Sequence, residues 1–466
     1  MEFDTDEAAL EYLFSATDYE KMQRVRYNAD TFSLDRMRRL LEALGRPERD
    51  LVSVHVAGTK GKGSTAAMLH AIGMAAGLKT GLYTSPHLVD IRERIRIGPE
   101  DISAGALRRL IESARPSIER FRAEGDPPTF FEIFTALAFR HFANVGTDLV
   151  VAEVGLGGRL DATNVLAPEV SVLTAISIDH THQLGDTLRA IAAEKAGIIK
   201  PGVPVVSQPQ PREALEVIEE ACRTAGAPLL VIGREVTYEW APASEGGRAG
   251  GGGRLAVRTP QATYDGLFVP LMGEHQALNA SAAIAAAERV RPLAGRRPGE
   301  AGLCPGGAGR LTPETVRRAL GEVRWPGRME WLQGRPDWLL DGAHNRASME
   351  RLMEGLSRHF PGRPMVFVFA SAADKDVDGM LAALAERTGG APVVFTRTDN
   401  PRAADPADLS ARFGRFGGRT SETAANVSEA IAAARRLAGT GKLVVVCGSL
   451  YLVGETKRIL EIGGCR

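Results

Sequence analysis

Cysteines are scarce in this sequence and long apolar runs are missing, and each absence argues against a class of protein. The 466 residues include four widely spaced cysteines without a C-x-x-C pair, namely Cys222, Cys304, Cys447 and Cys465. This usage argues against a disulfide framework or a zinc site and fits a reducing cytoplasm. No window approaches about 18 consecutive apolar residues, so we expect no membrane-spanning helix. The acidic start MEFDTDEAALEYLFS lacks the basic and apolar regions of a secretory signal.

Net charge is absent as well. Lysine plus arginine (57) balance aspartate plus glutamate (57), so no global field would attract nucleic acid or an anionic membrane. We therefore expect neither as a partner. A local anion site is compatible with this balance, because backbone amides alone can bind phosphate.

The chain is too long for one hydrophobic core, so at least two domains are expected. Short apolar runs alternate with helical patterns, which predicts largely parallel sheets with crossover helices. The predicted strands are 51–57, 148–154, 170–176 and 203–206 in the first half, and 338–340, 364–370, 392–396 and 442–447 in the second. A Pro/Gly linker in GEVRWPG, near 321–326, predicts an N-terminal domain of residues 1–322 and a smaller C-terminal domain of residues 323–466.

Two glycine-rich stretches interrupt the alternation of strands and helices. Residues 242–254 predict a flexible hairpin or loop tip, and residues 292–310 combine glycine with proline. Neither composition can pack a core, so we expect both to be surface insertions.

A glycine loop follows the first predicted strand. GTKGKGS, residues 58–64, lies between LVSVHVA and a strong helical pattern, which is the context that a phosphate-binding loop requires. The pattern G-x-x-x-x-G-K-[ST] is not met, because position 56 is Val56 and Gly63 separates Lys62 from Ser64. The glycines alone indicate a simple turn, but a lysine and a serine in this register favour a nucleotide site. Lys62 is the candidate for the β- and γ-phosphate contact.

GTKGKGS resembles the variant phosphate loop of the Mur ligase superfamily, and further motifs follow it in order. These are YTSPHLVDIRERI, TFFEIFTALAF, EVGLGGRLDATN, SIDHTHQLGDTL, AAEKAGIIKPG, WPGRME, DGAHN and DKD. The series covers nearly the whole chain and is similar to the folylpolyglutamate synthase family, including its bifunctional dihydrofolate synthase members. The resemblance implies an α/β protein with a P-loop-type ATPase domain, built on a mostly parallel sheet, and a smaller Rossmann-like C-terminal domain.

The resemblance also implies an activity. ATP would phosphorylate the carboxylate of a folate-type acid, and the amine of L-glutamate would attack the resulting acyl phosphate. The acid is a reduced folate, dihydropteroate or both, which the sequence leaves open. Magnesium at two sites, a cytoplasmic location and a monomeric state are implied as well.

The resemblance assigns Glu153, Ser85 and His180 as magnesium ligands. Glu153 ends a predicted strand, and the carboxyl end of such a strand faces a ligand crevice. Lys195 is implied to carry a carbamate, formed from carbon dioxide on its neutral amine, as a ligand of the second ion. Without the motifs, Glu153 would be an exposed carboxylate, His180 a structural histidine and Lys195 part of a solvated pair. Lys62, Lys195 and His180 are the implied catalytic residues.

The nucleotide site is implied to span both domains. Asn279 corresponds to an adenine contact, Arg328 to a phosphate contact and Asp341 to a ribose contact, so domain closure would complete the site. The full implied ATP set is Gly58, Thr59, Gly61, Lys62, Gly63, Ser64, Asn279, Arg328, Asp341 and His344.

The implied pterin contacts are Thr129, Phe130, Phe131, Glu132, Leu160, Asp161 and Ala162. The two phenylalanines could stack on a flat ring, or they could belong to the core. No residue specific for glutamate emerges, and Lys375 in DKD is a candidate only. Lys60 stands where asparagine is commoner, and Arg346 where proline is usual.

Two other activities deserve comparison. A Mur-type peptidoglycan-precursor amino-acid ligase shares the chemistry but would usually need an additional N-terminal domain, and residues 1–57 are few for one. A phosphate-loop switch or motor would keep the strict loop pattern and would lack Glu153, His180 and Lys195.

Overall fold

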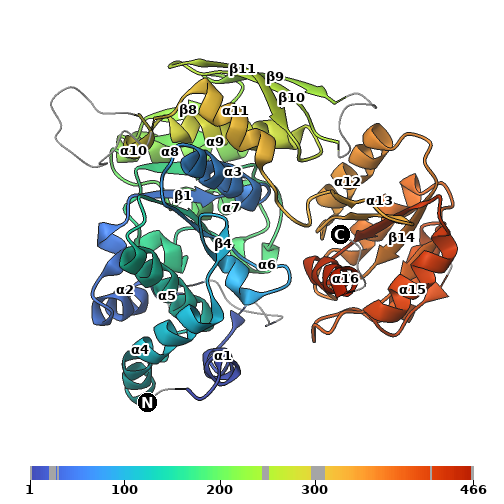
Figure 1. The fold of residues 1–466 in the computed structure, drawn as a ribbon, viewed down its shortest axis with the longest axis horizontal. Helices are drawn as coiled ribbons and strands as arrows, with labels where there is room; N and C mark the ends of the chain where they lie inside the picture. The colour runs from blue at the N-terminus through green and yellow to red at the C-terminus, as the bar shows by residue number, and fades with distance from the viewer. Residues whose placement is uncertain are drawn as a thin grey trace.

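The computed structural model describes residues 3–19, 22, 28, 31–243, 251–294, 310–419 and 422–462. They form two α/β domains, an N-terminal one on the left of Figure 1 and a C-terminal one on the right. Among these residues no helix is long and apolar enough to cross a membrane.

The N-terminal domain is built on an eight-stranded sheet with the order β4-β3-β2-β5-β1-β6-β7-β8. β1 (Ser53–Ala57) lies between β5 (Leu149–Glu153) and β6 (Val170–Leu173) and is parallel to both. Every residue of β1 and β5 is buried, because helices cover both faces of the sheet, which explains their mainly apolar sequences. The other strands are β2 (Thr80–Tyr83), β3 (Ile95–Ile97), β4 (Glu100–Asp101), β7 (Val205–Ser207) and β8 (Leu229–Val231).

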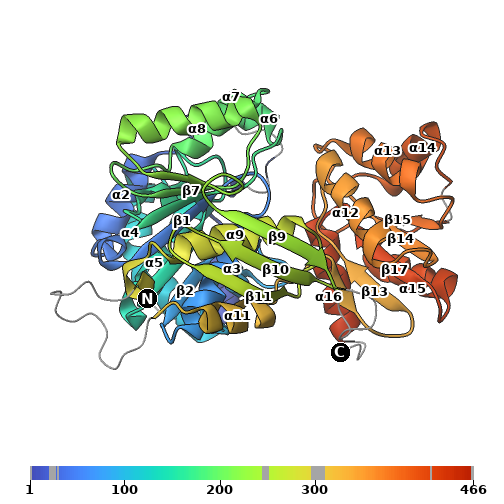
Figure 2. The same ribbon diagram turned by 90° about the horizontal axis from the view of Figure 1, so that it is seen from above.

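On one face of this sheet α3 (Lys62–Ala75) packs against α9 (His275–Ala287) and α11 (Pro313–Glu322). Side chains around the whole circumference of α3 are buried over two turns, from Ser64 to His70. Figure 2 shows an additional antiparallel sheet over this layer, and its strands are β9 (Thr237–Pro242), β10 (Gly253–Arg258) and β11 (Thr263–Val269). The phosphate-loop helix therefore has no water-facing side.

The opposite face carries a separate hydrophobic core. Its helices are α1 (Asp6–Phe14), α2 (Leu34–Ala43), α4 (Ala104–Ala123) and α5 (Phe130–Val145). A third cluster lies under α6 (Thr181–Leu184), α7 (Leu188–Ala196) and α8 (Arg212–Ala225).

The C-terminal domain has a six-stranded sheet with the order β12-β13-β17-β14-β15-β16, and a core on each face. Only the edge strand β12 is antiparallel among its described strands, so the expected Rossmann-like α/β class is confirmed. The strands are β12 (Glu330–Leu332), β13 (Asp337–Leu340), β14 (Met365–Phe369), β15 (Val393–Phe395), β16 (Glu422–Thr423) and β17 (Leu443–Cys447). The helices are α12 (Arg346–His359), α13 (Val377–Arg387), α14 (Pro406–Arg415), α15 (Val427–Ala438) and α16 (Leu450–Ile462).

All eight predicted strands are present, with one notable correction. The strand predicted at 170–176 ends at Leu173, because the chain then turns to bind the glycine loop. The N–H groups of Thr59 and Lys60 both donate to the carbonyl oxygen of Ala175, at 3.0 Å. The apolar run continues past the strand because Ile176 is buried for a different reason, in the core under α7.

The first glycine-rich stretch joins β9 to β10, and Pro242 pairs with Gly253 in antiparallel register. This confirms the predicted hairpin, although residues 244–250 lie outside the described residues. Most of the second stretch, 295–309, also lies outside them.

The domains meet at the loop that follows β2. A Cβ placed on Gly454 of α16 would overlap the carbonyl oxygen of Leu88, and Arg458 donates to the carbonyl oxygen of Val89 at 3.2 Å. The segment that contains Ser85 therefore docks on the last described helix of the C-terminal domain.

Candidate active site

The glycine loop leads from the carboxyl end of β1 into α3. Gly61 is the N-cap of α3 with φ +92°, and no side chain caps the first turn. Its amides are therefore available to an anion. A Cβ on Gly58 would overlap Thr174 Oγ1, and a Cβ on Gly63 would lie 2.9 Å from Trp325 Cζ2. The loop is thus fixed on both sides, and Trp325 of the predicted linker covers it.

Thr59 and Ser64 of the glycine loop are also fixed by their surroundings. The Thr59 hydroxyl exchanges 3.2 Å hydrogen bonds with the backbone N–H and C=O of Ser177. Ser64 is buried in the first turn of α3.

Glu153 forms the centre of the candidate metal site. It lies at the carboxyl end of β5, where its Oε2 accepts a 3.3 Å hydrogen bond from the N–H of Ser85. Lys62 Nζ lies 3.9 Å from the other carboxylate oxygen. Burial raises the pKa of Glu153, and the charges of Lys62 and Arg328 oppose this rise. The backbone of Ser85 and the side chains of Lys62 and Arg328 therefore act on one carboxylate, from both domains.

Lys195 is buried near the end of α7, with 5% of its surface exposed. Burial, followed by the charge of Lys62, lowers the pKa of Lys195 to about 7. A solvated Lys195–Glu194 pair is therefore wrong: Glu194 pairs instead with Arg159, at 2.9 Å. A Cβ on Gly158 would lie 2.7 Å from the Glu194 carbonyl oxygen and 3.1 Å from Lys195 Cα, so the EVGLGG loop packs directly on this part of α7.

His180 is the N-cap of α6 and has a left-handed backbone, with φ +51°. Desolvation, followed by the charge of Lys375 from the C-terminal domain, lowers the pKa of His180 to about 3. Lys62 and Lys195 act in the same direction. The shift favours the neutral imidazole, which is the form that binds a metal ion, and the residue is exposed to solvent in this structure.

The donor set fits magnesium bound together with a nucleotide. Among the described residues no group of three His, Cys, Asp or Glu side chains could by itself hold a metal ion. Glu153, Ser85 and His180 supply one carboxylate, one hydroxyl and one imidazole. Mg²⁺ usually takes only one or two protein carboxylates and completes its shell with phosphate oxygens and water.

Asn279 lies on α9, directly behind the glycine loop. Its Oδ1 accepts from Gln208 Nε2 at 2.8 Å and from the hydroxyl of Thr65 at 3.3 Å, and its Nδ2 donates to Gln276 Oε1 at 2.9 Å. The amide is therefore fixed by protein groups on both sides, and the adenine contact stays a prediction.

Asp341 and Arg328 join the WPGR and DGAHN motifs. The Asp341 carboxylate accepts from the N–H groups of Met329 and Ala343, at 2.9 and 2.8 Å. A Cβ on Gly342 would lie 2.7 Å from Arg328 Nη1. His344 shares a 2.8 Å hydrogen bond between its Nδ1 and the Gly342 carbonyl oxygen, and Asp341 thus shapes the turn that presents Arg328 toward Glu153.

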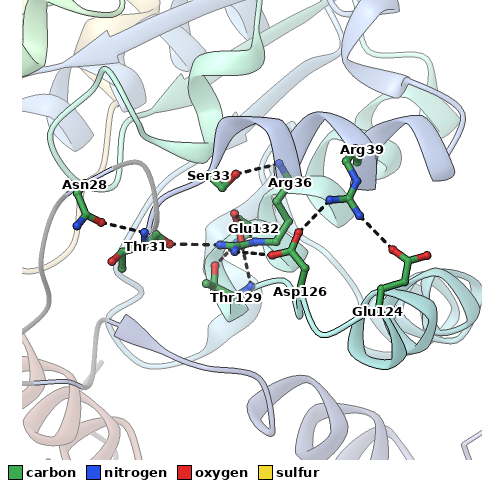
Figure 3. A network of polar contacts seen from close by, with 9 residues as sticks. All are labelled: Asn28, Thr31, Ser33, Arg36, Arg39, Glu124, Asp126, Thr129 and Glu132. Carbon is green, nitrogen blue, oxygen red and sulfur yellow. Dashed lines mark hydrogen bonds and ion pairs between the residues drawn. The ribbon is translucent and has the colours of Figure 1, made fainter.

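Thr129 and Glu132 form a capping box at the start of α5. Glu132 also binds the buried Arg36 of α2 at 2.9 Å, and Arg36 binds Asp126 at 3.1 Å. Figure 3 shows these contacts together. Both carboxylate oxygens of Glu132 therefore have protein partners. A direct pterin contact by Glu132 stays a prediction.

The two phenylalanines of this motif have different surroundings. Phe130 is in the core, with its ring 5.8 Å from that of Phe14 and 5.7 Å from that of Phe134. Phe131 is half-buried and faces the EVGLGG loop, where a Cβ on Gly155 would lie 2.5 Å from its Cζ. Phe131 is therefore the better placed of the two to meet a ligand.

Asp161 stabilises the same loop from within. Its carboxylate accepts from the N–H groups of Leu156 and Thr163, at 2.9 and 3.0 Å. Leu160 precedes it, and Ala162 is buried at the start of the short helix Ala162–Val165. Of the predicted pterin residues, Phe131, Leu160, Asp161 and Ala162 thus lie at the EVGLGG loop, whereas Thr129, Phe130 and Glu132 belong to the cap and the core of α5.

Sequence reasoning missed Asp179 and Arg36. Asp179 precedes His180 in a recognised motif, and it pairs with Lys60 at 2.9 Å, so the motif itself was a signal. Arg36 lies in a segment without a motif, and its partner Glu132 is 96 positions away, so no local pattern could indicate the pair.

Two family models match the chain. The Mur ligase middle domain matches residues 56–287, and the glutamate ligase domain of Mur ligases matches residues 327–450. The first match contains the glycine loop, Glu153 and Lys195, and the second contains Arg328 and Asp341.

Named relatives from other organisms match over most of the chain. The dihydrofolate synthase/folylpolyglutamate synthase of Bacillus subtilis is 34% identical over 436 residues, which are 92% of this chain and 95% of the relative. A probable bifunctional folylpolyglutamate synthase/dihydropteroate synthase of Haloferax volcanii is 38% identical over 423 residues. That match covers 90% of this chain, but the chain spans only 47% of the longer relative.

Solved structures agree with these sequences. Folylpolyglutamate synthase of Mycobacterium tuberculosis, complexed with ADP, has a TM-score of 0.84 and 33% identity, over 98% of this chain and 99% of that one. An Escherichia coli protein in complex with DHPP and ADP has a TM-score of 0.80 and 28% identity, over 98% of each chain. The chain therefore belongs to the folylpolyglutamate synthase/dihydrofolate synthase family of Mur-type ligases.

Proposed function

We propose that this protein uses ATP to join L-glutamate to the carboxylate of a folate through an acyl phosphate. The acid is dihydropteroate, a tetrahydrofolyl polyglutamate or both. One observation carries the proposal: Lys62 of the glycine loop lies beside Glu153 and acts electrostatically on His180 and Lys195. A phosphate held by the loop would meet all the groups that this chemistry needs.

Phosphoryl transfer depends on positioning and charge neutralisation. The free amides at Gly61 and the ammonium group of Lys62 would hold the β- and γ-phosphates, and Arg328 would reach them from the C-terminal domain. Bound magnesium, at two sites, would neutralise further charge on the transferred group. Glu153, Ser85, His180 and modified Lys195 would hold the ions.

The carbamate on Lys195 would form from the neutral amine, which the lowered pKa makes available. The nitrogen attacks the carbon of carbon dioxide, a C–N bond forms, and one proton leaves the nitrogen. The product carries a negative charge and two oxygen donors. This converts the site's most buried cation into a ligand for the second ion.

The ligation step needs a second nucleophile and a dry site. We assign ATP and folate binding to residues 1–322 and glutamate binding to residues 323–466, where Lys375 acts on His180 from across the junction. Lys375 would attract a carboxylate of the incoming glutamate. Closure of the two domains would exclude water from the acyl phosphate. We expect a monomer to be sufficient, because the groups named above come from one chain.

A phosphate-release assay tests the proposal directly. The protein is incubated with ATP and glutamate, and dihydropteroate, a reduced folate or neither is added. Release that requires both a pterin substrate and glutamate supports the proposed function, and the preferred pterin decides between the two activities. Equal release without either substrate contradicts it. Release with a nucleotide-sugar peptide in place of the pterin would indicate a peptidoglycan-precursor ligase.

A further inference from the structure

One oxygen atom of Asp179 joins the two domains. Its Oδ2 accepts a hydrogen bond from Lys60 Nζ at 2.9 Å and another from Asn345 Nδ2 at 3.0 Å. Lys60 belongs to the glycine loop, and Asn345 stands at the start of α12 in the C-terminal domain. The side chains of Lys60 and Asp179 are 14% and 10% exposed, so water competes weakly for these bonds.

The two polar atoms of the Asn345 side-chain amide make different contacts. Its Oδ1 accepts from the N–H of Ser348, at 3.0 Å, and so caps α12. Its Nδ2 is left to donate across the domain junction. Asp179 Oδ1 accepts from the N–H of His180, also at 3.0 Å. Each polar atom of the bridge therefore has a partner, and among the bonds of the bridge the Asn345–Asp179 bond is the one that crosses the domain junction.

The Asp179 carboxylate is largely buried and pairs with Lys60 Nζ at 2.9 Å. A buried carboxylate needs strong donors. A nucleotide phosphate near the loop would compete with Asp179 for the Lys60 ammonium group. The Asn345 bond would then become more important to Asp179.

We propose that Asp179 is a positioning residue that sets the C-terminal domain against the phosphate loop, through Asn345 on one side and Lys60 on the other. A phosphate bound in the loop would draw the Lys60 ammonium group away from Asp179. Asn345 would then be the main hydrogen-bond donor to Asp179 Oδ2, which favours the closed arrangement of the domains. The inference rests on the proposed function only in its kinetic readout, since the glutamate-binding groups would be brought to the acyl phosphate by this contact.

The substitution Asn345→Asp separates the two contacts of Asn345. Aspartate caps a helix as well as asparagine does, so α12 keeps its cap, but a carboxylate now faces Asp179. We expect kcat/KM for glutamate to fall by about 10- to 100-fold, the range for loss of a hydrogen bond to a charged group. ATP affinity should change little. Asn426→Asp is the matched control, because Asn426 caps α15 in the same way at an exposed position.

The exchange Asp179→Asn with Asn345→Asp tests the contact itself. It puts the amide on the N-terminal domain and the carboxylate on the C-terminal domain, so one hydrogen bond across the junction is restored and Lys60 keeps a nearby anion. We expect each single variant to lose glutamate efficiency and the double variant to recover most of it. A merely structural role in either domain would make the two losses additive, and that result would overturn the proposal.

Solution scattering with ATP provides a readout independent of ligation. The single variants should have a larger radius of gyration than the original protein, and the double variant should return to the original value. If the original protein fails to ligate glutamate but shows this pattern, the proposed function is wrong and the positioning role stands. Kinetics and radii of Asn345→Asp equal to those of the Asn426→Asp control would reject the positioning role.

Discussion

Gly61 and Asn279 are in such close contact that a Cβ on Gly61 would overlap the Oδ1 atom of Asn279. The amide cannot turn away, because Gln208 and Gln276 bind it from both sides. Any side chain at position 61 must therefore displace the backbone of the loop itself. This contact adds a steric requirement to the conformational one, since Gly61 also has φ +92°.

Gly61→Ala should lower ATP affinity by at least about tenfold, because a displaced loop no longer directs its amides at the phosphates. Gly45→Ala is a matched control: Gly45 has φ +90°, and nothing lies within 4 Å of its Cβ position. Both substitutions incur the same backbone penalty, about 1–2 kcal/mol. Calorimetric titration with ATP and urea unfolding separate the effects. Equal ATP affinities in the two variants would show that the Asn279 contact is unimportant.

Lys195 should make the free energy of unfolding depend on pH. Its native pKa of about 7 lies below the value of about 10.4 in an unfolded chain. Between these values the unfolded state binds more protons, so stability rises with pH, by at most about 1.4 kcal/mol per unit. Below pH 7 both states are protonated and the destabilisation is complete. Urea unfolding from pH 7 to 10 in carbon-dioxide-free buffer should show a smaller slope for Lys195→Met than for the original protein, and the exposed Lys79→Met serves as the control substitution.

Lys195→Ala should lose most of the ligase activity, and added bicarbonate should not restore it, because the amine that would be modified is gone. Carbon-13 NMR with labelled bicarbonate should show a carbamate signal in the original protein and lose it in the variant. Full activity of the variant would remove the residue from the mechanism.

Glu153→Gln should reduce ATP-dependent phosphate release by about 10²-fold or more, the typical effect of losing one group of a charge clamp on a phosphoryl group. Glutamine keeps the volume and the acceptor for the Ser85 N–H, so the fold should be unaffected. Glu100→Gln, at an exposed position of β4, serves as the control. Retained release at normal magnesium concentrations would contradict the assigned role.

The strands were predictable and the long-range pairs were not, and the reason is physical. β1 and β5 are buried on both faces, so their sequences are mainly apolar, with Ser53, His55 and Glu153 as the buried polar exceptions. The burial of Lys195 has no such local sign, because EKAG is equally compatible with a surface helix. Its depth comes from the loop at Gly158, far earlier in the chain. Asp179 and Asn345, 166 positions apart, meet only when both domains have folded.

The sequence also could not indicate which way the side chains at the start of α5 point. Phe130 and Phe131 are chemically identical neighbours, and the fold places one in the core and the other beside the EVGLGG loop. Phe130 stacks on Phe14 of α1 and on Phe134 of its own helix. The motif resemblance identified both, but only the structure distinguishes them.

Arg36→Met should reduce the free energy of unfolding by about 3–5 kcal/mol, because it leaves the buried Glu132 carboxylate without its cation. The Arg36–Glu132 side chains are 8% and 7% exposed. The pair Arg38–Asp35 on the same helix is 60% and 86% exposed, so Arg38→Met should cost less than about 1 kcal/mol. Urea unfolding of both variants provides the comparison. Similar losses would mean that the network of Figure 3 contributes no special stability.

The burial of α3 from Ser64 to His70 has a consequence for the kinetics of amide exchange. A helix without a solvated side cannot fray sideways, so its deep N–H groups exchange with deuterium only when the whole N-terminal domain opens. A nucleotide should slow exchange in the glycine loop while it leaves the rates inside α3 set by global unfolding. The phosphate loop is thus attached to the slowest-exchanging segment of its domain, and the geometry of its amides persists through every smaller fluctuation.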